Sequence, residues 1–66
     1  MERDTLLTTN DLAVQINRPA GTLRQWRHRR YGPRGFLLGG IVMYRQSEVD
    51  RWLAEQERAA EPVPAA

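Results

Sequence analysis

A chain of 66 residues is long enough for one small domain with a limited core. The sequence has no cysteine, which excludes a disulfide framework and a thiolate metal site. It also has no apolar run near the roughly 20 residues that span a bilayer, and its N-terminus differs from a signal peptide. We therefore expect a cytoplasmic protein without membrane contact.

The net charge is only +2, but it is unevenly distributed. All ten basic residues are arginines, and seven of them lie between Arg18 and Arg45, where the chain has no Asp or Glu. The other three share the two ends with all eight acids, so the centre carries +7 and the ends carry −5. Clustered cations favour a polyanion, because neutralised phosphates release counterions. A solvated basic surface without a partner is the alternative interpretation.

A first helix is predicted from about Thr9 to Ile16. Thr8 is suited to cap it, and Asp11 is the capping-box partner three residues later. Leu7 and Leu12 occupy the two positions of a hydrophobic staple, which fixes how the chain enters the helix.

A second helix follows a short turn. Pro19 is predicted as its first residue, where a missing N–H costs nothing, and it continues to about Arg30. Leu23 and Trp26 are expected to dock on the first helix, which leaves long polar side chains outside. The outward face comprises Gly21, Arg24, Gln25 and His28.

A hairpin is predicted around Gly39-Gly40, a two-residue turn signal between two short apolar runs. Alternation assigns Phe36, Leu38, Val42 and Tyr44 to the core side, and Leu37, Ile41 and Met43 to the outside. Exposed together, the last three would form an apolar patch that marks a contact between protomers. Cover by the tail or by the last helix is the alternative.

A third helix is predicted from Ser47, as its cap, to about Ala59 or Ala60. Its expected inner stripe is Val49, Trp52, Leu53 and Gln56. Residues 61–66 contain two prolines and are predicted to be a disordered tail, so the domain covers residues 1–60. The order helix, turn, helix, hairpin, helix predicts a mainly α fold with a small β-hairpin, a winged helix-turn-helix.

Five pieces of the sequence also follow one another as in a known family. They are Leu7-Thr8, residues 22–27, Tyr31-Gly32-Pro33, the hairpin of residues 38–45, and residues 47–53. In this order and spacing they resemble the small phage excisionases and the MerR-like (AlpA-like) winged helix-turn-helix DNA-binding domains. The chain departs from the family pattern at the turn Asn17-Arg18-Pro19 and in the apolar outer side of its hairpin.

The resemblance implies that the second helix reads the major groove of double-stranded DNA and that the hairpin touches the flanking backbone. Excisionases of this kind bind repeated sites, bend DNA and direct a phage integrase toward excision in the host-cell cytosol. MerR-like and AlpA-like relatives regulate transcription.

Side-chain chemistry divides the candidate contacts into two groups. Arg24 and Gln25 are of the types that pair with guanine and adenine edges, and the resemblance also places Thr22 and His28 on the recognition helix. His28 is interpreted as a neutral hydrogen-bonder, with a pH switch or a metal ligand as the alternatives, and the sequence has no second histidine for a metal site. The remaining arginines are suited to phosphates. These phosphate candidates are Arg18, Arg27, Arg29, Arg30, Arg34 and Arg45.

The sequence shows no nucleophile–base pair, no carboxylate dyad in the basic centre and no metal-binding cluster. We therefore expect a protein that is not an enzyme and that needs no cofactor, metal or small-molecule ligand. The preferred interpretation is an excisionase that loads several copies cooperatively. A small transcription regulator and a protein-docking adaptor without DNA binding are the alternatives.

Overall fold

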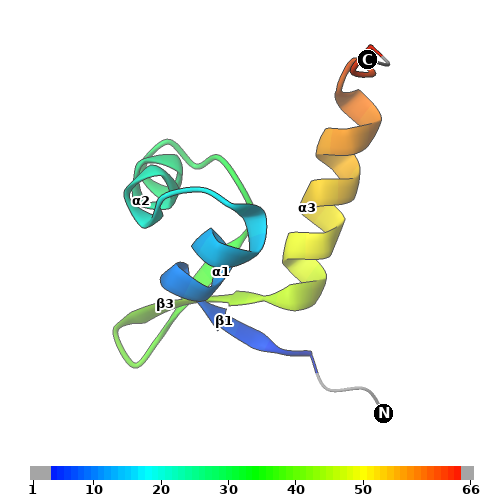
Figure 1. Cartoon of the computed structure of the whole chain (residues 1–66). Helices are drawn as coiled ribbons and strands as arrows, with labels where there is room; N and C mark the ends of the chain where they lie inside the picture. The colour runs from blue at the N-terminus through cyan, green and yellow to red at the C-terminus, as the bar shows by residue number, and fades with distance from the viewer. Residues whose placement is uncertain (1–3, 65–66) are drawn as a thin grey trace.

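The computed structural model describes residues 4–64, so positions 65 and 66 of the predicted tail lie outside it. Three helices pack around a small three-stranded sheet, and the helix-turn-helix-hairpin-helix order is as predicted (Figure 1). The elements are β1 (Leu6–Thr8), α1 (Thr9–Ile16), α2 (Ala20–His28), β2 (Gly35–Leu38), β3 (Ile41–Arg45) and α3 (Gln46–Ala59).

The start of α1 is determined by local hydrogen bonds. The N–H of Asp11 donates to the Thr8 hydroxyl at 3.0 Å, and the N–H of Thr8 donates to the Asp11 carboxylate at 3.1 Å. This is the predicted capping box, and it satisfies two backbone donors that the helix leaves free. Leu7 and Leu12, the two staple residues, are both buried.

The bounds of α2 differ slightly from the prediction. Pro19 is the N-cap and not the first helical residue, because its ψ of 144° is extended while its carbonyl already accepts from Thr22 and Leu23. The helix ends at His28 and not near Arg30, since Arg30 takes a left-handed conformation with φ 54°. Both differences concern single turns at the helix ends.

The sheet has the order β1-β3-β2 with antiparallel pairing throughout. The hairpin turns at Gly39 and Gly40, whose φ values of 59° and 85° are those of a type I′ turn, which needs glycine-like residues. β1 was not predicted. It is only three residues long and shows no alternation of apolar and polar residues that would predict a strand. It is a strand because it pairs with the edge of β3.

The predicted faces of the hairpin are partly wrong. The two-residue turn pairs Leu38 with Ile41, Leu37 with Val42 and Phe36 with Met43, and directly paired residues share a face. Phe36 and Leu38 therefore lie opposite to Val42 and Tyr44, and not beside them. Leu37 is likewise on the other face from Ile41 and Met43, so the three residues of the predicted patch do not lie together.

The inner face of the sheet meets the helices, and no helix of residues 4–64 covers the outer face (Figure 1). The buried core joins β1, α1, α2, β3 and α3, and consists of Leu7, Leu12, Ala13, Leu23, Tyr44 and Val49. The outer face of the sheet carries the apolar residues Leu6, Phe36, Leu38, Ile41 and Met43. They range from half-buried to 62% exposed for Ile41.

An aromatic cluster joins the end of α2 to α3. The ring centroids of Trp26 and Trp52 are 5.5 Å apart, and the Tyr31 ring meets both of them edge-on at 5.2 and 5.7 Å. Trp26 and Trp52 were expected to pack in the core, and both are half-buried in this cluster. Their contacts hold α3 against the helix-turn-helix.

The start and the inner stripe of α3 differ from the prediction. Ser47 is the second helical residue and not a cap: its N–H and its hydroxyl donate to the Asp4 carboxylate at 3.0 and 2.6 Å. These bonds lower the pKa of Asp4, and Arg45 contributes less. Leu53 is 38% exposed, so it lies outside the buried stripe that Val49 occupies.

Candidate nucleic-acid interface

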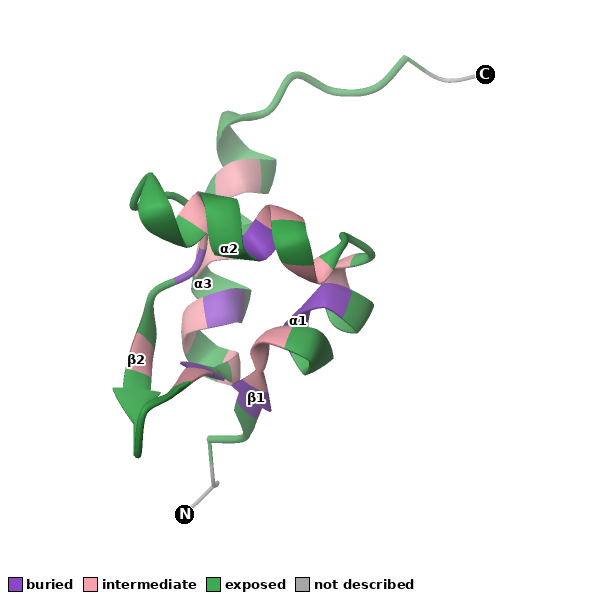
Figure 2. Ribbon diagram, turned by 90° about the vertical axis from the view of Figure 1, so that its left-hand side faces the viewer, coloured by how far each residue is buried: buried purple, intermediate pink, exposed green. Residues whose placement is uncertain are grey.

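The outward side of α2 is open to solvent. The exposed residues include the four that the helical period assigned to this face, Gly21, Arg24, Gln25 and His28. Figure 2, in which α2 lies at the front, shows exposed residues along most of the helix. Leu23 is its one buried residue. The helix is nine residues long and lies beside the hairpin, so it has the position of a recognition helix.

Two adjoining cavities separate α2 from the hairpin. One, of about 490 Å³, lies against the outward face and is lined by Thr9, Arg24, Arg27, His28, Arg30, Val42 and Tyr44. The other, of about 500 Å³, lies at the C-terminal end of α2 and continues to Arg34 in the loop before β2. Both are lined by Arg27, Arg30 and Tyr44, so they form one groove. Among the described residues, no acid lines it.

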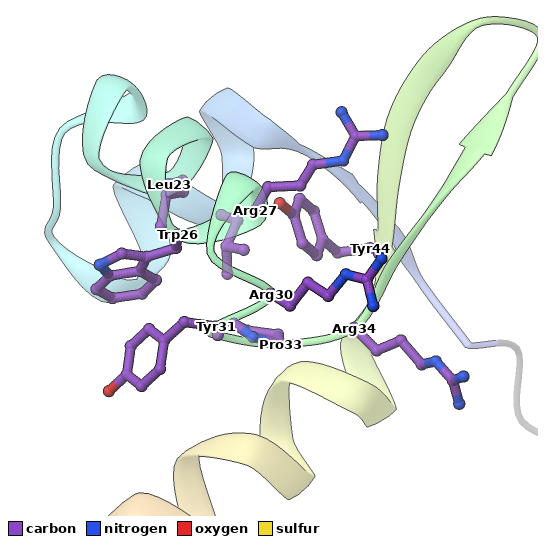
Figure 3. Close-up of a pocket in the computed structure, with 11 residues that line it drawn as sticks. Leu23, Trp26, Arg27, Arg30, Tyr31, Pro33, Arg34 and Tyr44 are labelled. Atoms are coloured by element: carbon purple, nitrogen blue, oxygen red, sulfur yellow. The ribbon is translucent and has the colours of Figure 1, made fainter.

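The end of the groove is built on an apolar floor. Leu12, Leu23 and Pro33 line it from below, and the aromatic cluster bounds it on one side. Above this floor the side chains of Arg27, Arg30 and Arg34 extend to the same side of the loop, near Tyr44 (Figure 3). Cations on a low-dielectric floor interact more strongly with an anion than the same charges in open water.

Six of the seven arginines of the basic centre form no ion pair within residues 4–64. In residues 4–64, the arginines that form ion pairs are Arg45, with Asp4 at 3.8 Å, and Arg51, with Glu48 at 2.8 Å. The six arginines from the turn before α2 to the loop after it form none within this range. They are Arg18, Arg24, Arg27, Arg29, Arg30 and Arg34. Their charges are therefore available to a ligand.

The structure does not bring all the predicted contact residues together. Thr22 is half-buried, and Arg29 lies beside Tyr31, outside the groove. Arg18 lies in the turn between α1 and α2. Arg45 is on the outer face of the sheet, where its guanidinium lies 5.5 Å above the Phe36 ring. The groove itself thus contains four of the predicted arginines together with His28.

Tyr44 and Thr9 are groove residues that the sequence interpretation did not include. Tyr44 was expected in the core, and it is 4% exposed, yet it also lines both cavities of the groove. Gly35, its pairing partner in β2, leaves room for this ring, since a Cβ there would lie 2.9 Å from it. The glycine at the start of this apolar strand was the sequence signal that could have indicated a large side chain packed close to the backbone there.

The sequence matches the helix-turn-helix domain family over residues 6–57, which includes every helix and strand of the groove. The chain belongs to this family. The resemblance in the sequence and the predicted winged helix-turn-helix fold are thereby confirmed. Comparisons with curated proteins and with solved structures give no match.

A helix-turn-helix domain indicates DNA binding, and the exposed recognition helix beside a basic groove is the corresponding feature of this structure. None of the helices in the described part combines the length and apolar character that crossing a membrane requires. The helix-turn-helix of this chain is therefore a DNA-binding module.

Proposed function

We propose that this helix-turn-helix protein is an excisionase: a non-enzymatic architectural protein that loads several copies on repeated DNA sites, bends the DNA and assists an integrase. Arg24, Gln25 and His28 on the outward face of α2 contact bases, with Thr22 at its flank. Arg27, Arg30 and Arg34 hold the backbone where it passes between α2 and the hairpin. Arg18 and Arg29 extend the phosphate contacts at the two ends of the helix.

Cooperative loading is proposed to come from contacts between the outer faces of the sheets of neighbouring copies. A module of this size buries only about 600–1,000 Å² of protein surface on DNA, which gives limited affinity and discrimination. Contact between neighbouring copies increases occupancy without any new base contact. The exposed apolar residues Leu38 and Ile41, beside Phe36 and Met43, support such a contact, because a soluble protein rarely leaves a continuous apolar face uncovered.

A gel-shift series tests DNA binding and loading together. Tiled duplexes covering the DNA that flanks the gene are titrated with protein at several salt concentrations. With about four to six phosphates neutralised, the logarithm of the affinity should fall with a slope of about −4 to −5 against the logarithm of the salt concentration. A slope of zero would contradict DNA binding and favour a protein-docking adaptor.

The excisionase activity is tested by recombination. A plasmid carrying the attachment sites is incubated with the integrase encoded nearest to the gene, with and without the protein. Excision that depends on the protein, together with bending of the bound fragment, is the expected result. Binding to a promoter that changes transcription but not excision would favour a regulator.

A further inference from the structure

The C-terminal end of α2 has an unusual backbone for its sequence. Arg30 has φ 54°, in the left-handed region. Its N–H donates to the carbonyl of Arg27 at 3.1 Å, and the N–H of Tyr31 donates to that of Trp26 at 2.8 Å. This is the hydrogen-bond pattern of a Schellman motif, in which the left-handed residue is usually glycine because a Cβ is unfavourable there.

The end of α1 has the same geometry with a more suitable residue. Asn17 has φ 58°, and the N–H of Arg18 donates to the carbonyl of Ala13 at 2.9 Å. Asparagine occupies the left-handed region more readily than arginine. The backbone conformation therefore accounts for asparagine at position 17, whereas glycine would suit position 30 better than arginine.

The Arg30 side chain has a defined place. It lines both cavities of the groove, as do Arg27 and Tyr44, and Arg34 joins them at the C-terminal end. Figure 3 shows the Arg30 side chain lying between those of Arg27 and Arg34. Three flexible arginine side chains that line one cavity suit a phosphate group, whose oxygens accept several charge-assisted hydrogen bonds.

We propose that this cavity binds one backbone phosphate of the DNA, held jointly by Arg27, Arg30 and Arg34, and that Arg30 is retained in the left-handed position for this contact. The proposal rests on the DNA binding described above. It assigns three of the six arginines without ion pairs to a single phosphate, instead of spreading them along the strand. The edge-on contact of Tyr31 with Trp26 stabilises the loop that carries Arg34.

The first test compares stability with binding in Arg30→Gly. We expect its melting temperature to be unchanged or to rise by up to about 5 °C, because glycine suits the left-handed position. Its affinity for the shortest bound duplex should fall about 10- to 100-fold. Asn17→Gly makes a similar backbone change at the end of α1 and should leave the affinity unchanged. A lower melting temperature for Arg30→Gly, or full affinity, would overturn the proposal.

The second test locates the phosphate. Neutral methylphosphonate groups replace the phosphates of that duplex one at a time. One position should weaken binding of the wild-type protein, and Arg27→Ala, Arg30→Gly and Arg34→Ala should each lose sensitivity to that same position. Arg29→Ala, which removes an equal charge outside the groove, should keep it. Three different positions for the three variants would overturn the shared site.

Two further outcomes distinguish a site for a DNA phosphate from a site for free phosphate and from a protein that does not bind DNA. Inorganic phosphate alone should not raise the melting temperature of the wild-type protein, and a rise that Arg30→Gly abolishes would assign the cavity to free phosphate instead. A wild-type protein that binds no duplex would contradict the proposed function itself, whereas normal binding by Arg30→Gly contradicts only the phosphate site.

Discussion

Helices α2 and α3 have the same construction on their inner sides and different charges on their outer sides. Each buries one aliphatic residue, Leu23 in α2 and Val49 in α3, and each adds a tryptophan to the aromatic cluster. On α2 the outward arginines have no acidic partner among the described residues. On α3, Arg51 donates to Glu48 at 2.8 Å. The availability of charges to a ligand, and not their number, therefore distinguishes a binding helix from a structural one.

The largest expected effect is a loss of stability when the buried side of α2 is truncated. Leu23→Ala removes a side chain that is 2% exposed, so it should lower the free energy of unfolding by about 2–5 kcal/mol. The total free energy of unfolding of a chain of this length is of the same order. Urea denaturation measures it. The matched change in α3, Leu53→Ala, should cost less than about 1 kcal/mol. Equal losses would mean that α3 is buried more deeply than described.

The different roles of the outward arginines in α2 and α3 are tested by removing one arginine from each helix. Arg24→Ala should weaken binding to the specific duplex about 5- to 150-fold and binding to unrelated DNA much less, because a lost base contact costs about 1–3 kcal/mol. Arg51→Ala should change neither affinity by more than about twofold, since its exposed ion pair contributes little. Gel shifts with both duplexes measure this. Equal losses on both duplexes would make Arg24 a phosphate contact.

A smaller effect concerns the outer face of the sheet, which neither helix covers. Met43→Glu places a charge in the middle of this face, so loading on repeated sites should lose its cooperativity. Affinity for a single site should stay within about twofold. Val14→Glu, on the exposed side of α1, is the control and should load normally. An unchanged loading curve for Met43→Glu would remove the outer face from the proposed protomer contact.

The smallest effect concerns how α3 begins. The hydrogen bonds from Ser47 hold the pKa of Asp4 below its ordinary value of 3.8, so the folded state favours the carboxylate. This contribution to stability is present above the ordinary pKa and is lost as the pH falls through the lowered one. Thermal melts of Asp4→Ala should therefore lie below those of the wild type at neutral pH and converge with them in acid. Melting curves of Asp4→Ala that stay parallel to those of the wild type at every pH would contradict this role.

Elements that depend on neighbours in the chain were predictable. The capping box of Thr8 and Asp11 forms within a single turn, and Gly39-Gly40 supplies the positive φ values that a type I′ turn requires. The outward face of α2 follows from the helical period alone. In each case the interacting groups are at most a few residues apart, so the sequence contains the whole interaction.

Errors arose where distant segments decide the outcome. Ser47 resembles a cap, but Asp4 reaches its N–H from the other end of the chain. The error at Phe36 and Leu38 has a local cause instead: the two-residue turn pairs Leu38 with Ile41, and alternation counted straight through the turn ignores this pairing. β1 exists because β3 offers it an edge. Periodicity within one segment cannot report such partners, since it carries no information about what the segment meets.

The sequence by itself determined the order of the elements, the acid-free basic centre and the face of α2 that is turned outward, because these follow from local geometry and from charge. Only the tertiary structure decided that Arg27, Arg30 and Arg34 share a cavity and that Arg45 lies on the other side of the sheet with Asp4. A shared cavity depends on packing between segments, and the buried contacts of Leu12, Leu23 and Tyr44 supply that packing.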